Sequence, residues 1–266
     1  MARALWSGSI SFGLVNVPVE VYQATKDKDI RFHQLCKKDK SRIRQKLVCE
    51  ANKEEVSRDE IVKGYEISPD HYVVFDSDEL KKLQPEKNPN IEIINFVDLA
   101  EIDPLYFETP YYLLPKAGAE KPYKLLMEAM KDSKRIGIGR FVIHGKEYLG
   151  AIRVLRNVIC LETMRFADEV TTADKLDTGP EGKVKLNKSE VDIAKQLIDT
   201  LAAKFEPEMY KNEYRERVLS AIEAKAKGRK IVAAPEGKPE AKVADLMSAL
   251  KKSIEQAKHT KAKKRA

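Results

Sequence analysis

Three consecutive stretches with strand character, joined by very short links, constrain the fold more than any other feature. The stretches are Ile136–Ile143, Glu147–Leu155 and Val158–Phe166. The residues between them, His144-Gly145-Lys146 and Arg156-Asn157, have turn chemistry. Parallel strands need a crossover of about a dozen residues or more, so these strands are expected to run antiparallel as a meander.

Strand patterning also occurs earlier in the chain. Over residues 9–22, apolar positions alternate with polar ones or with Pro18, which is typical of a half-buried strand. The alternating apolar residues are Val15, Val17, Val19 and Val21. Short strands are expected at 72–75 and 91–97. The aromatic stretch 103–115 has apolar residues on both faces, so it is expected to be buried on both sides or to lie in a subunit interface.

Helices are expected to be few in the first two thirds of the chain. Asp76 or Ser77 can cap a short helix that ends near Leu83. Apolar residues at helical spacing from Tyr123 to Met130 predict a second helix, with its methionines as core filler. Strands before and after this helix indicate a mixed, mainly β fold, either a β-barrel or a strongly curved sheet.

The C-terminal third is expected to be helical. Amphipathic helices are predicted from Asn187 to Phe205 and from about Glu208 to Lys227, followed by a Pro/Gly-containing linker at 229–240. A third amphipathic stretch runs from Val243 to Ile254, and the basic residues from Lys258 onward are expected to be disordered. No internal repeat is evident.

Composition excludes several classes of protein. The first residues contain no unbroken apolar stretch of the kind found in secretory signals, and no apolar run reaches the roughly 18 residues of a membrane span. Three cysteines are too few for a disulfide framework and suit a reducing compartment. We therefore expect a cytoplasmic protein.

A basic segment, residues 26–46, stands out from its surroundings. It carries nine Lys/Arg against three Asp, whereas 47–110 carry six Lys/Arg against sixteen Asp/Glu. If 42–47 is a strand, Arg42, Arg44 and Lys46 share one face, and two residues of rise span about 6.6 Å. That distance is close to the rise of two phosphates on one DNA strand, at about 3.4 Å each. A cationic edge therefore suits a polyanion, although a solvated surface hairpin is the alternative.

The C-terminal residues 225–266 are also basic, with thirteen Lys/Arg against four Asp/Glu. Such uneven charge favours a nucleic-acid partner over a uniformly charged surface. The candidate DNA-binding residues are Lys26, Lys28, Arg31, Lys37, Lys38, Lys40, Arg42, Arg44 and Lys46 in the basic segment, with Lys258, Lys261, Lys263, Lys264 and Arg265 in the tail.

Motifs for catalysis or cofactor binding do not occur. The chain has no Gly-x-x-x-x-Gly-Lys phosphate loop, no Gly-x-Ser-x-Gly and no His-Glu-x-x-His. Gly137 and Gly139 lie in a meander without a third glycine, so they are expected to mark close packing or a bulge. We assign no catalytic residue and no cofactor.

One arrangement has metal-like spacing. His33-x-x-Cys36 precedes Cys49-x-x-Asn52, and two such pairs would suit tetrahedral zinc. Asn52 is a poor ligand, so only His33, Cys36 and Cys49 remain as weak candidates. The prediction is that no metal is bound and that the thiols are free on facing strands.

Several segments closely resemble the bacterial Ku family over about residues 2–228. The longest is the start of the chain, from Ala2 through Trp6-Ser-Gly-Ser-Ile-Ser-Phe-Gly13 to Tyr22. Further matching segments are Gly64-Tyr-Glu-Ile-Ser-Pro-Asp70, Phe96-Val-Asp-Leu-Ala-Glu-Ile-Asp-Pro104, Pro110-Tyr-Tyr-Leu-Leu-Pro115, Gly137-Ile-Gly-Arg-Phe-Val142, Glu162-Thr-Met-Arg-Phe-Ala-Asp168, Lys195-Gln-Leu-Ile-Asp199 and Tyr214-Arg-Glu216.

The resemblance implies a Ku-like β-barrel core with extended arms, two copies of which form a ring over a double-stranded DNA end. It implies a non-enzymatic, nucleoid-associated homodimer that acts in non-homologous end joining of double-strand breaks and recruits an ATP-dependent DNA ligase. The basic segment occupies the position of the bridge over DNA. Some members carry a fuller cysteine pattern there, which Asn52 interrupts.

We accordingly divide the chain into a core with bridge at 1–184, a helical region for possible ligase docking at 185–228, and a linker with basic tail at 229–266. The alternative function is a general architectural protein that coats duplex DNA without needing ends.

Overall fold

The computed structural model describes all residues except 1–2, 86–89, 144, 174–185, 230–245 and 264–266. The chain divides into two compact units, Met1–Thr172 and Ala173–Ala266. The boundary expected at 184, and most of the expected linker, lie outside the described residues.

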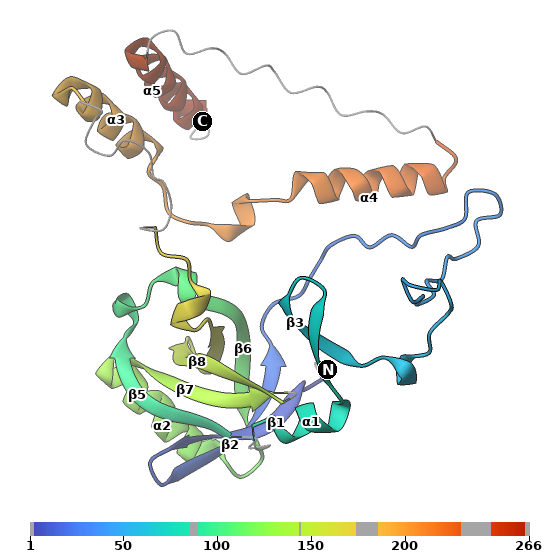
Figure 1. Ribbon diagram of the computed structural model, residues 1–266. Helices are drawn as coiled ribbons and strands as arrows, with labels where there is room; N and C mark the ends of the chain where they lie inside the picture. Colours follow the sequence, from blue (N-terminus) through green and yellow to red (C-terminus); the bar gives the residue numbers. More distant parts are fainter. Residues whose placement is uncertain (1–2, 86–89, 144, 174–185, 230–245, 264–266) are drawn as a thin grey trace. The chain divides into compact units, whose positions relative to one another are not determined.

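The first unit contains a closed β-barrel (Figure 1). Its strands, in their order around the barrel, are β1 (Trp6–Phe12), β2 (Val15–Gln23), β6 (Phe107–Pro115), β9 (Val158–Met164), β8 (Lys146–Leu155), β7 (Arg135–Ile143) and β5 (Asn90–Asp98). All neighbours pair antiparallel except β1 and β5, whose short parallel contact closes the barrel. The predicted antiparallel meander of β7, β8 and β9 and the predicted barrel are therefore confirmed.

The strand expected over 9–22 is instead a hairpin of β1 and β2. Gly13 turns the chain with φ 56°, in the left-handed region that glycine adopts without a Cβ penalty. The alternation in β2 is as predicted, because Val17, Val19 and Val21 are buried in the barrel. The turn was missed because Gly13 is followed by Leu14, an apolar residue that turns rarely use.

Helix α2 (Glu120–Ser133) packs on the barrel core through Tyr123, Leu126 and Met130, which are buried as its periodicity predicted. The Tyr123 hydroxyl donates to the carbonyl of Leu113 at 2.7 Å and accepts from the amide of Ile159 at 2.8 Å. These bonds join α2 to β6 and β9, and burial raises the pKa of Tyr123. One hydroxyl thus satisfies two buried backbone groups of the barrel.

Gly139 marks both a bulge and a close approach, as expected. The register between β5 and β7 shifts between Ile93 and Asn95, directly opposite Gly139 and Ile138. A Cβ on Gly139 would lie 2.6 Å from the carbonyl oxygen of Glu92. Only glycine allows the two backbones to come this close.

Residues 24–85 form a long excursion between β2 and β5, which we call the arm. None of its residues is buried. Its regular elements are η1 (Arg58–Glu60), β3 (Lys63–Ser68), β4 (His71–Phe75) and α1 (Ser77–Lys82). Strand β4 and helix α1 were predicted, whereas β3, which pairs antiparallel with β4, was not.

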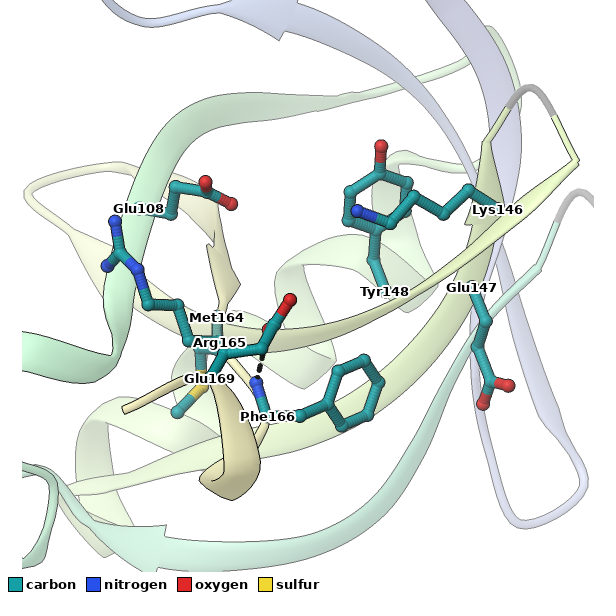
Figure 2. Close-up of a pocket in the computed structure, with 8 residues that line it drawn as sticks. All are labelled: Glu108, Lys146, Glu147, Tyr148, Met164, Arg165, Phe166 and Glu169. Carbon is teal, nitrogen blue, oxygen red and sulfur yellow. Dashed lines mark hydrogen bonds between the residues drawn. The ribbon is translucent and has the colours of Figure 1, made fainter. Parts of the chain in front are cut away.

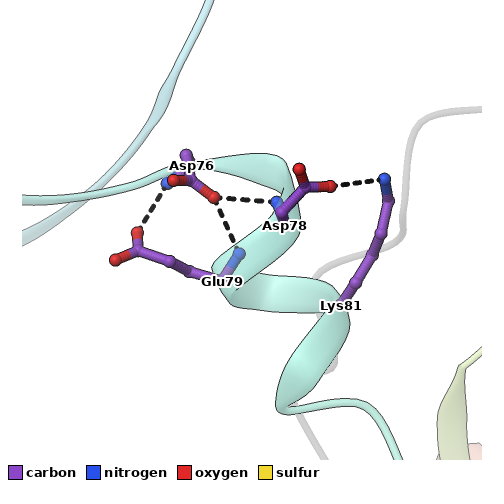
Figure 3. Close-up of polar contacts among 4 residues, drawn as sticks. All are labelled: Asp76, Asp78, Glu79 and Lys81. Atoms are coloured by element: carbon purple, nitrogen blue, oxygen red, sulfur yellow. Dashed lines mark hydrogen bonds and ion pairs between the residues drawn. The ribbon is translucent and has the colours of Figure 1, made fainter.

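Helix α1 begins at the predicted cap (Figure 3). The Asp76 carboxylate accepts from the amides of Asp78 at 2.8 Å and Glu79 at 2.7 Å. In return, the amide of Asp76 donates to the Glu79 carboxylate at 2.9 Å. This reciprocal capping satisfies amides that the first helical turn leaves without partners.

Short 3₁₀ turns flank β6 and β9: η2 (Leu99–Glu101), η3 (Pro104–Tyr106) and η4 (Ala167–Glu169). In the stretch 103–115, Leu113 is buried and most other residues of β6 are half-buried, while Leu105 stays exposed. The expected burial on both faces is therefore only partial within the chain.

The second unit contains helices α3 (Lys188–Leu201), α4 (Glu213–Ala226) and α5 (Leu246–Lys263), with the turn η6 (Pro207–Met209). Helix α3 ends before the predicted Phe205, and α4 starts later than predicted because Asn212 caps it through the amide of Arg215 at 2.9 Å. Helices α3 and α5 pack against each other.

Candidate nucleic-acid interface

The basic segment 26–46 begins three residues after β2 ends, and apart from Ile30 and Cys36 its residues are exposed. The predicted strand at 42–47 is wrong. Backbone pairing in this segment is limited to an isolated bridge between Leu35 and Arg42. Alternation alone does not make a strand, because a strand also needs a partner backbone to satisfy its amides and carbonyls. Arg42, Arg44 and Lys46 therefore do not share the face of a strand.

Instead, the segment forms a tight turn at its centre. The amide of Cys36 donates to the carbonyl of Ser41 at 2.8 Å, and the amide of Lys40 donates to the carbonyl of Cys36 at 2.9 Å. Lys40 has φ 62°, in the left-handed region. We call residues 36–42 the basic turn, after Lys37, Lys38, Lys40 and Arg42.

The same turn occurs a second time, which corrects the expectation that the chain has no internal repeat. The amide of Cys49 donates to the carbonyl of Glu54 at 2.9 Å, and the amide of Lys53 donates to the carbonyl of Cys49 at 2.9 Å. Lys53 also has φ 62°, and a bridge between Val48 and Glu55 matches that between Leu35 and Arg42. We call residues 49–55 the acidic turn.

A short polar side chain stabilises each turn at the equivalent position. Asp39 Oδ1 accepts from the amide of Ser41 at 3.0 Å, and Asn52 Oδ1 accepts from the amide of Glu54 at 3.1 Å. The bond from the Ser41 amide, with further bonds from the Ser41 hydroxyl and the Cys36 thiol, lowers the pKa of Asp39. Asp39 and Asn52 thus act in the same way in the two turns.

These contacts change how the metal-like spacing is understood. Cys36 pairs with Asp39 within its turn rather than with His33, which lies before the turn. Cys36, Cys49 and Cys160 are all free thiols. Across the described part of the chain, no three His, Cys, Asp or Glu side chains come together to hold a metal ion.

The cations of the basic segment differ in their neighbours. Arg31 pairs with Asp27 at 2.6 Å, and Lys46 pairs with Glu55 at 2.6 Å. No ion pair among the described residues includes the other seven, and the Lys40 ammonium donates to the carbonyl of Lys37 at 2.7 Å. Those without an ion pair are Lys26, Lys28, Lys37, Lys38, Lys40, Arg42 and Arg44. The segment therefore keeps most of its positive charge uncompensated within the chain.

The C-terminal candidates are placed differently from expectation. Lys258, Lys261 and Lys263 lie within helix α5, so the start of the tail is helical and not disordered. The half-buried residues of α5 include Met247, Leu250 and Ile254, one face that suits packing on α3 and so stabilises the helix. Lys264 and Arg265 lie outside the described residues.

Two neighbouring cavities lie on the barrel. The smaller, of about 140 Å³, is lined by Glu108, Lys146, Glu147, Tyr148, Met164, Arg165, Phe166 and Glu169 (Figure 2). Several of its polar groups have partners: Lys146 lies over the Tyr148 ring at 5.1 Å, and Glu169 accepts from the amide of Phe166 at 2.8 Å. Arg165 donates to the carbonyls of Leu105 at 3.0 Å and Phe107 at 2.9 Å.

The larger cavity, of about 420 Å³, shares three of these residues and is otherwise mainly apolar. Its additional lining residues are Val97, Glu101, Ile102, Tyr106, Ile138, Leu149 and Ala167. Among the described residues lining either cavity, none forms a nucleophile–base pair of the kind that hydrolases and transferases use. Among the described helices, none is both long and apolar enough to cross a membrane.

Comparison with known proteins identifies the barrel. A family model described as the Ku70/Ku80 beta-barrel domain matches residues 11–193. A non-homologous end joining protein Ku from Koribacter versatilis is 42% identical over 254 residues, covering 96% of this chain and 86% of the relative. The protein of the same name from Bacillus subtilis is 40% identical over 255 residues, covering 95% and 82%.

An archaeal relative of the same name, from Archaeoglobus fulgidus, is 42% identical over 253 residues, covering 95% of this chain and 98% of its own. The match to the family model takes in the arm and all barrel strands except the start of β1. The resemblance drawn from the sequence segments is thereby confirmed, and the chain belongs to the Ku family.

Proposed function

We propose that this chain binds double-stranded DNA ends as a ring-shaped homodimer, independently of sequence, and recruits an ATP-dependent DNA ligase for the end joining of double-strand breaks. The observation that carries the proposal is the arm, which buries no residue and whose basic segment carries seven cations that form no ion pair among the described residues. Because such a segment buries little surface within the chain, contact with another molecule would add to its stability.

The phosphate backbone is the partner that the arm suits best. Lys and Arg neutralise phosphates, and such contacts position a protein on DNA without reading its bases. A protein that must accept any broken end needs this kind of contact. The proposed contacts are the cations of the basic segment 26–46, together with Lys258, Lys261, Lys263, Lys264 and Arg265 of the C-terminal segment.

Exposed apolar residues of the arm support a homodimer. A two-stranded sheet is marginal in water on its own, yet β3 and β4 expose large apolar side chains. These are Tyr65, Ile67, Tyr72, Val73 and Val74. Contact with a second copy would remove this surface from water and so stabilise the hairpin.

The proposal assigns no catalytic step to the chain and needs no cofactor. End recognition is a matter of topology, since a closed ring can load onto duplex DNA only at an end. The alternative is an architectural protein that coats duplex DNA from the side.

Competition between DNA forms separates these functions. We expect firm binding to a linear duplex and little binding to a covalently closed circle of the same sequence and length, measured by gel shift. Cutting the circle once should restore binding fully. Equal affinity for the closed and the linear form would contradict the ring and favour the architectural protein.

The second unit supports a docking role for the ligase. It exposes apolar and aromatic side chains from the last turn of α3 to the first turn of α4: Ile198, Leu201, Phe205, Met209, Tyr210 and Tyr214. The rings of Phe205 and Tyr210 stack with centroids 5.6 Å apart, and both residues are 73% exposed. Exposed aromatic residues of this kind are typical of interface anchors.

We expect that Phe205→Ala with Tyr210→Ala removes stimulation of the ligase in a nick- and end-joining assay while the affinity for DNA ends is kept. Leu125→Ala, at an exposed apolar position of α2, is the matched control and should leave stimulation unchanged. If the double variant stimulates the ligase normally, these aromatic residues do not dock it.

A further inference from the structure

The basic turn and the acidic turn have the same backbone and opposite charge. Each is closed by the same two backbone hydrogen bonds, the same left-handed lysine and the same type of side-chain cap. Equivalent positions carry Lys37 and Glu50, and Arg42 and Glu55. Two surfaces of one shape therefore present complementary electrostatic potentials on the same chain.

Most of the charges that distinguish the turns form no ion pair among the described residues, although Glu54 accepts a hydrogen bond from the Asn52 side chain at 2.6 Å. Lys37, Lys38 and Arg42 belong to none of the ion pairs among described residues, and neither do Glu50 and Glu54. Among the described residues, the acidic turn forms one ion pair, in which Glu55 contacts Lys46 at 2.6 Å. Lys46 lies between the two turns and belongs to neither. Each turn is thus available to a partner outside the chain.

Apolar residues flank both turns and are about half exposed. They are Leu35 at 47%, Ile43 at 54%, Leu47 at 50% and Val48 at 56%. Apolar residues surrounded by charged ones are typical of protein–protein contacts. A phosphate backbone binds through charge and hydrogen bonds and gains nothing from contact with apolar side chains. This observation favours a protein surface as the partner of the turns.

We propose that, in the homodimer, the basic turn of one protomer docks on the acidic turn of the other. A two-fold axis makes this contact twice, since each chain supplies one turn of each sign. An unrelated partner would need one surface complementary to the basic turn and another complementary to the acidic turn. A second copy of this chain carries both. The inference rests on the proposed homodimer and narrows its DNA contacts, because Lys37, Lys38 and Arg42 then face protein while Lys26, Lys28 and Arg44 remain for phosphates.

Charge reversal with two chains tests the pairing without DNA. The first chain carries Lys37→Glu, Lys38→Glu and Arg42→Glu, which makes both of its turns acidic. The second carries Glu50→Lys and Glu54→Lys, which makes both of its turns basic and keeps the Lys46–Glu55 pair. After the chains are mixed and exchanged, native mass spectrometry measures the dimers, and we expect heterodimers about tenfold or more above the statistical proportions.

A matched mixture gives the control. A chain with Lys121→Glu and Lys124→Glu, both on the exposed face of α2, replaces the acidic chain and should pair with the basic chain in statistical proportions. A single chain with all five turn substitutions regains complementary turns and should dimerise like the unaltered protein. This rescue also shows that the substitutions leave the fold intact.

The outcomes separate this inference from the function on which it rests. If the unaltered chain is a monomer by sedimentation equilibrium, the proposed homodimer fails together with the pairing. If it is a dimer but the acidic and basic chains mix statistically, the homodimer stands and the pairing of turns is overturned.

Discussion

Replacing Lys26, Lys28 and Arg44 by glutamine should lower the affinity for a duplex end by about a thousandfold or more near physiological salt. These exposed cations lie outside both turns and belong to no described ion pair, so they are free to meet phosphates. A dimer loses six contacts, and each phosphate contact contributes about 0.9 to the slope of log affinity against log salt. We therefore expect the slope to become less steep by about five, measured by fluorescence anisotropy over a salt series.

The loss should be the same for any DNA sequence, because phosphate contacts carry no base information. The charge-matched control replaces Lys121, Lys124 and Lys225, which are exposed on helices α2 and α4, by glutamine. It alters net charge equally and should leave the salt slope within error of the unaltered protein. A slope unchanged in the arm variant would mean that these three residues do not touch DNA.

Paired cations offer a graded comparison within the same segment. Arg31 and Lys46 already have carboxylate partners in Asp27 and Glu55, so their net contribution to binding phosphate is reduced. The sequence pattern does not distinguish the nine cations of the basic segment from one another. The structure separates the two cations that have a carboxylate partner from the seven that have none among the described residues. Substitutions of unpaired cations are therefore the more informative test of phosphate contact.

The parts of the fold that were predictable depend on local pattern. Strands β7, β8 and β9 follow from strand composition with short links, and the valines of β2 follow from alternation. Local pattern left open whether the strands close into a barrel or form a curved sheet, because closure depends on parallel pairing between β1 and β5, which are far apart in sequence. The resemblance to the Ku family predicted the barrel. No local pattern encodes which distant edges meet.

The arm shows the limit of the same reasoning. Cations alternate with Ile43 and Leu47 as they would in a strand, but backbone pairing within the described segment 26–46 is limited to an isolated bridge between Leu35 and Arg42. The repeat of the two turns was missed because only Cys and Lys are identical between them, while Lys37 and Arg42 correspond to Glu50 and Glu55. The usable signal was a cysteine followed at the third position by Asp or Asn and then by Lys, since short polar side chains favour such turns.

The C-terminal segment was misjudged for a related reason. High charge from Lys258 onward predicted disorder, yet α5 continues to Lys263. A helix that is already anchored by its apolar face on α3 extends at little cost, because propagation adds one hydrogen bond per residue fixed. The composition of residues 258–266 could not predict this extension, because it contains no information on the helix that precedes them.

Gly139→Ala should destabilise the barrel by about 3 kcal/mol or more. The new Cβ would lie 2.6 Å from the carbonyl oxygen of Glu92, so backbone must move where β5 bulges. Gly137→Ala is the matched control in the same strand, because its Cβ would meet side chains and no backbone atom: Ile93 at 3.1 Å and 3.2 Å, and the Phe96 ring at 3.4 Å. A side chain can rotate away, so the control should lose about 1 kcal/mol or less.

Trp6 in β1, the single tryptophan of the chain, packs against the barrel core and so reports barrel unfolding by fluorescence during chemical denaturation. Equal losses of stability for the two variants would mean that the close approach of β5 and β7 is not what requires glycine.

The stability of the β5–β7 pairing also affects DNA binding, because the arm leaves the barrel from β2 and returns to it at β5. A barrel that opens at the β5–β7 pairing releases one of the two attachments of the arm, so Gly139→Ala should also lower the affinity for DNA ends at temperatures where Gly137→Ala does not.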